Sequence, residues 1–289
     1  MAQTIIAVQE QASAMKYGRM VLNIALIVAS GSMLAIYAAE PPPGLLHKVA
    51  ERESANAEAM SNYTYRQSVT LQEINDRGVV TGEYHEVRDV TFSPKHERYE
   101  QVEGPPRNTL THIKMTPLDF EDIRNVEPFL LTKDKVKLYE GQYKGEEKVN
   151  GELCFLESVR PKQILSGQRF FEGLLWIRES DFSVIKSEGQ GVPQIETLRE
   201  QNLTPHFTTF RKNVDGQWFF PAQTYADDTL YFRDWPQHIR IEIRYLDYKK
   251  FGAESTIIFG AAGEQQPAPS TAPTTTPPST TAPAPTPPR

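Results

Sequence analysis

The chain has very little cysteine: Cys154 is the only one in 289 residues. A lone cysteine cannot form an internal disulfide, which excludes a disulfide-stapled scaffold. Cys154 stands in the strand-like run GELCFLESV. A free cysteine in such a run behaves as a small apolar side chain, so we predict a buried, unreactive thiol.

The sequence also lacks the short motifs of common enzymes. No G-x-S-x-G is present, and His85-Glu86 is not followed by a second histidine at helical spacing. Gly189-Gln190-Gly191 lacks the rest of a dinucleotide fingerprint, and we predict a loop there. We therefore expect no enzymatic activity, no cofactor and no metal site.

Clusters of basic residues are missing as well. The chain has 31 Lys and Arg against 37 Asp and Glu, a net charge of −6, and the basic residues are scattered. Nucleic-acid binding needs a concentrated basic surface, so nucleic acid is excluded as a partner.

Both ends of the chain differ in composition from the middle. Residues 20–39 (MVLNIALIVASGSMLAIYAA) carry no charge, follow Lys16 and Arg19, and end in small residues. This pattern predicts a signal peptide over 1–39, with Met15 as an alternative start, and a secreted or periplasmic protein. If it is not cleaved, the same run is long enough to anchor the chain in a membrane.

The C-terminal residues 263–289 are rich in Pro, Thr and Ala. They cannot bury enough apolar surface to fold, so we predict a disordered tail. It is either a solvated end or a spacer, and the sequence leaves both open. The remaining residues, 40–262, are predicted to form a single domain, because no linker divides them. We expect the protein to be a monomer.

The predicted domain contains many strands and few helices. HIRIEIRYLDY alternates strictly, with Ile239, Ile241, Ile243 and Tyr245 on one side, and similar runs recur along the chain. Helices are predicted over 45–61 and after Thr116-Pro117, a typical N-cap and first helical position. These elements predict an α+β fold: a large curved antiparallel sheet, in the form of a half-open β-barrel, covered by a few short helices.

One predicted hairpin, FFEGLLWIRESDFSVIKSEG (170–189), is apolar on both faces. Leu175 and Ile177 point one way and Leu174 and Trp176 the other. We predict that both faces are covered and that at least one borders a cavity. With a three-residue loop, Trp176 would pair with Val184.

Aromatic residues are concentrated in the second half of the chain. They are interpreted either as the wall of a cavity for an apolar ligand or as ordinary core packing. The cavity candidates are Leu175, Trp176, Ile177, Phe182, Phe210, Trp218, Phe220 and Tyr231.

The element order and two segments resemble a known family. The segments are V-N-G…C-F-L-E-S…P-K (149–162) and G-L-L-W-I-R…D-F-S-V-I-K-S-E (173–188). They resemble the bacterial outer-membrane lipoprotein carrier (LolA/LolB-like) superfamily, which includes RseB-like periplasmic domains. The resemblance implies a half-open barrel with helices as a lid over an apolar cavity for acyl chains. By its place in the first strand, Arg66 is the candidate for the cavity arginine of the carrier.

The expected function is therefore a secreted or periplasmic binding protein for lipids or lipoprotein acyl chains. The alternative is an envelope sensor or interaction module that binds another protein and carries no lipid.

Overall fold

The computed structural model describes residues 40–197 and 201–251. The predicted signal peptide (1–39) and Pro/Thr-rich tail (263–289) lie outside the described residues. No helix within the described ranges is long and apolar enough to cross a membrane.

The described residues form two α-helices, one short 3₁₀ helix and two sheets. The helices are α2 (Leu45–Met60), α3 (Pro117–Asn125) and η1 (Val136–Leu138). The strands are β1 (Tyr63–Ile74), β2 (Val80–Phe92), β3 (Arg98–Val102), β4 (Arg107–Asn108), β5 (Tyr139–Val149), β6 (Glu152–Pro161), β7 (Phe170–Arg178), β8 (Val184–Val192), β9 (Ile195–Glu196), β10 (Gln201–Asn202), β11 (Phe207–Val214), β12 (Trp218–Tyr231) and β13 (Pro236–Lys250).

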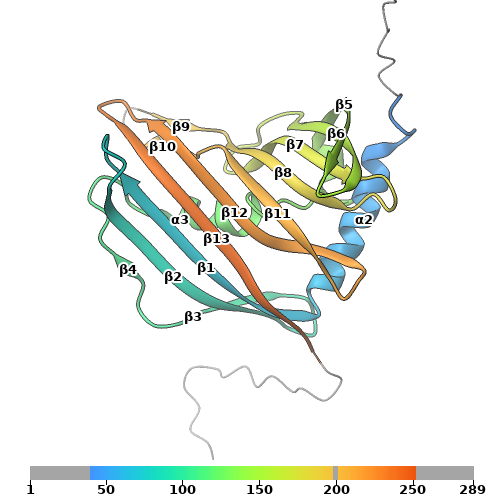
Figure 1. Cartoon of the computed structure of the whole chain (residues 1–289), viewed down its shortest axis with the longest axis horizontal. Helices are drawn as coiled ribbons and strands as arrows, with labels where there is room; N and C mark the ends of the chain where they lie inside the picture. The colour runs from blue at the N-terminus through green and yellow to red at the C-terminus, as the bar shows by residue number, and fades with distance from the viewer. Residues whose placement is uncertain (1–39, 198–200, 252–289) are drawn as a thin grey trace, which may run out of the picture. The chain divides into compact units, whose positions relative to one another are not determined.

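Among the described residues, the main sheet has 11 strands in the order β3-β2-β1-β13-β12-β11-β8-β7-β6-β5, with β4 beside β2. The strands that pair are antiparallel. Figure 1 shows α2 and α3 on the same side of this sheet, which twists without closing into a barrel. The predicted fold class is confirmed.

The inner face of the sheet is the one that the helices cover. In β13 the predicted alternation is confirmed, since Ile239, Ile241, Ile243 and Tyr245 are buried and the residues between them are more exposed. β1 alternates in the same way, with Val69 and Leu71 on the inner face. Period-two alternation therefore decides which side chains meet α3.

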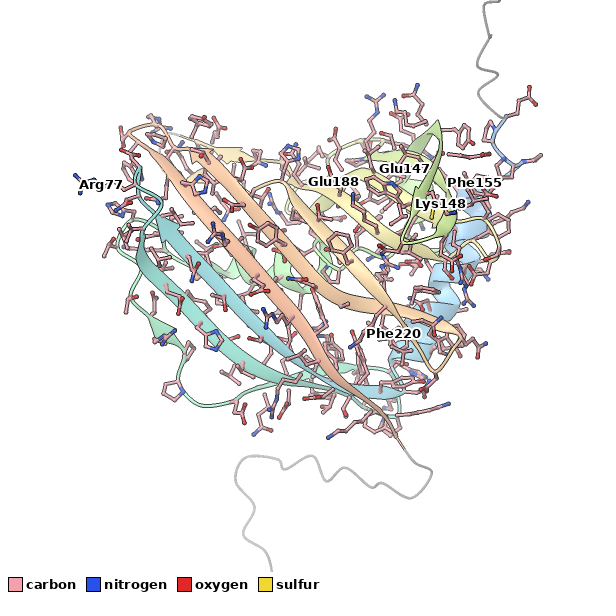
Figure 2. The ribbon with its side chains drawn as sticks, in the orientation of Figure 1. Arg77, Glu147, Lys148, Phe155, Glu188 and Phe220 are labelled. Atoms are coloured by element: carbon pink, nitrogen blue, oxygen red, sulfur yellow. The ribbon has the colours of Figure 1, made fainter. Side chains whose placement is uncertain are left out.

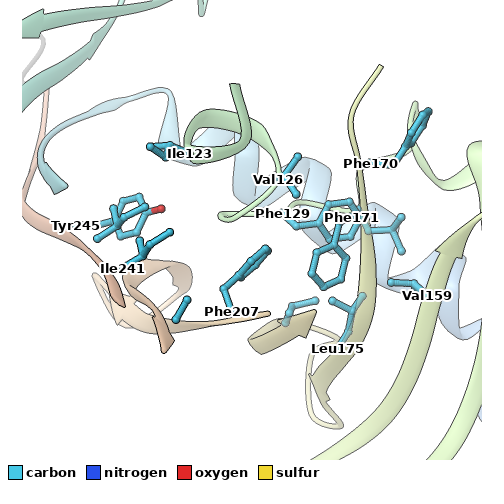
Figure 3. Packing of buried hydrophobic residues seen from close by; sticks show 14 of the residues in the cluster. Ile123, Val126, Phe129, Val159, Phe170, Phe171, Leu175, Phe207, Ile241 and Tyr245 are labelled. Carbon is cyan, nitrogen blue, oxygen red and sulfur yellow. The ribbon is translucent and has the colours of Figure 1, made fainter. Parts of the chain in front are cut away.

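The core lies between this inner face and the segment that contains α3. Figure 3 shows Phe129 and Phe171 packed together, with Phe207 and Leu175 beside them. The rings of Phe129 and Phe171 stack with their centroids 4.7 Å apart.

The helix α3 begins where the sequence predicts. Thr116 is its N-cap, with Pro117 in the first turn, and Asp119 closes a capping box by accepting from the backbone N–H of Thr116 (2.6 Å). The helix ends at Asn125, shortly before Pro128, which cannot continue it.

The helix α2 presents a mixed face to the sheet. Val49 and Ala50 are buried, and so are the polar Glu53 and Asn56. Asn56 pairs with the backbone of Phe219: its Nδ2 donates to the carbonyl (2.8 Å), and its Oδ1 accepts from the N–H (3.1 Å). Arg211 of β11 lies 2.7 Å from Glu53.

The hairpin β7–β8 is covered on both faces, as predicted. Leu175 and Ile177 lie in the main core, whereas Trp176 packs in a second cluster with Cys154, Ile185 and Phe219. Trp176 also donates from Nε1 to Glu147 (2.8 Å), which Figure 2 labels beside Lys148 near the β5–β6 turn.

The predicted register of this hairpin is wrong. Ile177, and not Trp176, pairs with Val184, because the connection is longer than three residues and an irregularity follows Trp176. The Asp181 carboxylate accepts from the N–H of Ser183 (3.1 Å), and Phe182 adopts a left-handed φ of 60°. The polar side chains of the turn therefore set the register.

The prediction of a loop at Gly189-Gln190-Gly191 is also wrong, because these residues belong to β8. Gly189 pairs with Gly173 of β7, and a Cβ on Gly173 would lie 2.1 Å from the carbonyl oxygen of Glu188. The glycines permit a close approach of two strands.

Cys154 is buried, as predicted. Burial raises the pKa of its thiol to about 11, which keeps it in the unreactive thiol form.

Candidate functional site

A cavity of about 450 Å³ lies between α3 and the inner face of the sheet. This volume falls in the usual range of small-molecule sites. Its rim consists of residues 112–116, 201–205 and 232–235.

The floor of the cavity is aliphatic. β1 contributes Val69 and Leu71, β13 contributes Ile239 and Ile241, and α3 contributes Ile123 from above. All five are buried. Figure 3 shows Ile123 on one side and Ile241 and Tyr245 on the other. Such a floor favours an apolar ligand, since it offers no hydrogen bonds.

A buried glutamate positions the first rim segment. Glu73 of β1 accepts hydrogen bonds from the backbone N–H groups of Thr111, His112 and Ile113, at 2.6 to 3.1 Å. Burial opposes ionisation of Glu73, but these donors outweigh it and hold the pKa of its carboxyl below the ordinary value. The carboxylate therefore fixes the loop that leads into α3.

The second rim segment is fastened to α3 by Asn202 of β10. Its Nδ2 donates to Asp119 Oδ1 (3.0 Å) and to Thr116 Oγ1 (3.3 Å). Behind it, Gln194 and Thr204 exchange hydrogen bonds between side chain and backbone (2.7 and 3.2 Å). The rim is therefore held by side chains and not only by strand pairing.

The helix α3 is held over the sheet by a buried ion pair. Arg169, which precedes β7, contacts both oxygens of Asp122, with Nε–Oδ1 at 3.0 Å and Nη2–Oδ2 at 2.6 Å. Two-point pairing of this kind fixes orientation as well as distance. Thr209 of β11 donates to the carbonyl of Glu127 (2.7 Å) and holds the residues that follow the helix.

Glu127 lines the cavity and is the most unusual group in it. It is only 6% exposed, and its Oε2 has no hydrogen-bond partner among the described residues. Burial, together with the Asp122 and Asp119 carboxylates, raises the pKa of Glu127 to about 8. At neutral pH it is mostly a neutral acid, which both donates and accepts hydrogen bonds.

None of the nine residues singled out from the sequence lines this cavity. Leu175 and Ile177 are fully buried in the main core, and Phe220 packs edge-to-face on Tyr63, with centroids 5.1 Å apart. Figure 2 labels Phe220 near α2. Trp176 lies in the second cluster. These positions have the packing role that the sequence left open as the alternative.

Two further candidates pack beside α2. Phe182 lies below the Lys48 ammonium (5.0 Å from the ring centroid), and Trp218 below the Arg52 guanidinium (5.0 Å). Such contacts help to hold α2 beside the neighbouring strands.

The last three candidates point to the outer face. Phe210 is 39% and Tyr231 76% exposed. Arg66 pairs with Asp89 (3.1 Å) and Glu103 (3.4 Å). Arg66 follows the inward-facing Tyr65, so alternation in β1 turns it away from the helices.

Of the residues that line the cavity, the sequence singles out the alternating isoleucines of β13 and the helix N-cap Thr116. Trp235, which lines the rim, belongs to the aromatic-rich second half of the chain. Glu127 carried one local signal, its place just before Pro128 at the end of a predicted helix. This position predicts a turn. It does not predict that Glu127 is buried, because its burial depends on β11, which is distant in sequence.

A second groove, of about 890 Å³, lies beside the start of α2 and β5. Its lining includes Leu46, Lys133, Lys162 and the buried Glu157. Burial raises the pKa of Glu157 to about 7, and its Oε2 has no partner in the described chain. Its lining mixes apolar residues such as Leu45 and Val136 with charged residues such as Lys137.

In the described part of the chain, no group of three His, Cys, Asp or Glu side chains lies close enough to hold a metal ion.

No protein-family model and no curated protein matches the chain. Several solved structures are similar to it. The LolA superfamily protein NE2245 from Nitrosomonas europaea is 11% identical, with a TM-score of 0.33, over 72% of this chain and 92% of that one. A putative outer membrane lipoprotein-sorting protein domain from Vibrio parahaemolyticus is 10% identical, with a TM-score of 0.33, over 73% and 95%.

The MucA/MucB complex of Pseudomonas aeruginosa is also similar, at 12% identity and a TM-score of 0.20, over 72% of this chain and 98% of that one. Lipoprotein-sorting proteins, which the sequence resembles, are thus among the similar solved structures. The identities and TM-scores are low, so the ligand has to be inferred from the cavity.

Proposed function

We propose that the protein binds lipids or lipoprotein acyl chains in the cavity between α3 and the sheet, and that it acts without catalysis. The observation that carries this proposal is a cavity of about 450 Å³ whose floor is aliphatic. Enclosing a chain of about sixteen carbons is worth roughly 12 kcal/mol at ~0.8 kcal/mol per methylene. Association costs several kcal/mol, which leaves enough for stable binding.

The predicted signal peptide supports a secreted or periplasmic location for this binding. In such a compartment a carrier would meet acyl chains of the envelope, and the cavity would shield them from water. The proposed location and the proposed ligand are consistent with each other.

The test is binding of N-phenyl-1-naphthylamine, an uncharged apolar dye that fluoresces when it leaves water. We expect micromolar, saturable binding by the full chain. Leu71→Phe, which fills the floor, should weaken binding about fivefold or more, because it displaces apolar contact area of the ligand.

Thr70→Phe is the matched control, since Thr70 lies on the other face of the same strand. It should bind like the unaltered protein. Equal binding by both variants, or none by the unaltered protein, would refute the proposal.

The second candidate function is an interaction module for another envelope protein. The observation in its favour is a set of exposed aromatic residues on the outer face, Phe210, Tyr225 and Tyr231. Phe210→Ser with Tyr231→Ser should then abolish a stoichiometric complex with an envelope protein, whereas Leu71→Phe should leave it intact.

A further inference from the structure

Two residues that line the cavity each carry a buried polar atom without a partner among the described residues. The two atoms are Oε2 of Glu127 and Oδ1 of Asn202, and the two residues are 6% and 5% exposed. Buried polar atoms are nearly always hydrogen-bonded, because leaving one unpaired costs its hydration. Two such atoms, in residues that line one cavity, point to a ligand with polar groups of its own.

The two atoms differ in what they offer. Asn202 Oδ1 only accepts hydrogen bonds, while the Nδ2 of the same amide is already used by Asp119 and Thr116. Glu127, as a neutral acid, can donate its O–H. A matching ligand presents a carbonyl oxygen to Glu127 and an O–H or N–H to Asn202.

The charges of the lining exclude an anionic group at this point. The acidic residues of the lining beside Glu127 are the half-buried Asp119 and the buried Asp122. Arg169 neutralises Asp122 from outside the lining. Lys114 and Arg233 belong to the lining, but Lys114 is exposed, and Arg233 donates to the carbonyl of Thr197 (2.6 Å). A ligand carboxylate beside Glu127 would face carboxylates and be repelled.

We propose that Glu127 and Asn202 form a polar recognition site inside the cavity, which selects uncharged acyl esters or amides over free fatty acids. This inference rests on the proposed function. The acyl carbonyl accepts from Glu127, and a neighbouring hydroxyl or amide N–H donates to Asn202. The aliphatic floor then holds the chain.

The experiment compares two displacing ligands with the same twelve-carbon chain on the full-length protein. Monolaurin is an uncharged ester with free hydroxyls, and laurate is an anion. Each displaces the bound naphthylamine dye at pH 6.5. We expect monolaurin to displace the dye at about tenfold lower concentration than laurate, since only monolaurin satisfies both buried atoms.

Variants of Glu127 test the assignment. Glu127→Leu should reduce the preference for monolaurin over laurate by about fivefold to tenfold, measured against the dye affinity of the variant itself. Glu127→Gln keeps a donor and should retain most of the preference. Glu157→Leu removes a buried, unpartnered carboxyl outside this cavity, and as the matched control it should change neither quantity.

The affinity for monolaurin, measured at several pH values, separates hydrogen bonding by Glu127 from apolar contact with the chain. The groups that face Glu127 are Asp119 and Asp122 with its partner Arg169, and Tyr245 of β13. Between pH 6.5 and 9 the affinity for monolaurin should fall in the unaltered protein and stay constant in Glu127→Gln. Only the unaltered protein loses its donor in that range.

Equal displacement by both ligands, or an unchanged preference in Glu127→Leu, would overturn this inference. The proposed function would still stand if the unaltered protein binds the dye normally. Failure of the unaltered protein to bind the dye would instead refute the proposed function, and the inference with it.

Discussion

Glu127 makes the stability of the folded protein depend on pH. Its pKa is about 8 in the folded protein against an ordinary value of 4.5. Below pH 4.5 both states are protonated and Glu127 contributes nothing. As pH rises to 8, only the unfolded chain loses its proton, so the free energy of unfolding falls, by on the order of 4 kcal/mol at most.

We therefore expect Glu127→Gln to have little effect at pH 5 and to raise the free energy of unfolding by several kcal/mol at pH 8.5. Urea unfolding at both values measures it. The exposed Glu172→Gln serves as the control and should show no such pH-dependent gain. A constant offset between Glu127→Gln and the unaltered protein at both pH values would contradict the assignment.

The side of the sheet on which a residue lies was predictable only where alternation is strict. The residues of β13 were placed correctly because polar and apolar side chains alternate without interruption. Phe210 and Tyr231 were misplaced because aromatic content says nothing about direction. Gln67 and Glu73 are buried because the alternation of β1 puts them on the same face as Val69 and Leu71. No local pattern signals the burial of Glu127, since distant segments cover it.

At the scale of elements, α2 is tied to the sheet by the buried ion pair Glu53–Arg211. Both side chains are 1% exposed, and burial raises the pKa of Glu53 even though Arg211 lowers it. Removing one member of such a pair leaves an uncompensated charge, which costs more than the pair contributes.

We expect Arg211→Met to lower the free energy of unfolding by about 3 kcal/mol or more. Adding Glu53→Leu should recover part of this loss, because the stranded carboxyl is then removed. Arg160→Met breaks the exposed pair with Glu140 (2.6 Å) and should cost less than about 1 kcal/mol. Urea unfolding at pH 7 measures all three, and additive losses in the double variant would count against the buried pair.

Helix starts were easier to predict than hairpin turns. The start of α3 follows from Thr116, Pro117 and Asp119, which are adjacent in sequence. The β7–β8 turn depends on Asp181 and on the left-handed conformation of Phe182, which a bulky residue rarely adopts. A register inferred from loop length alone therefore failed.

At the scale of the whole molecule, the class of fold was predictable, and the order of strands was not. Turn signals and alternation predict antiparallel neighbours along the chain. They do not predict that β13 lies beside β1, or β11 beside β8. The pairing of β13 with β1 brings Val69 and Leu71 beside the isoleucines of β13. The sequence therefore does not predict where the cavity lies.

The tryptophans offer the most direct test of the cavity. Trp235 lines its rim, whereas Trp176 packs in the second cluster, away from it. Two proteins are compared, one with Trp235 and one with Trp176 as the only tryptophan, the others replaced by Phe. Each is titrated with a monoacylglycerol that carries bromine on its chain, a short-range quencher of tryptophan fluorescence.

If the cavity binds acyl chains, the fluorescence of Trp235 falls in a saturable manner, and that of Trp176 stays unchanged. If Trp235 shows no saturable quenching, or if both tryptophans are quenched alike, the acyl chain does not occupy the cavity beneath α3.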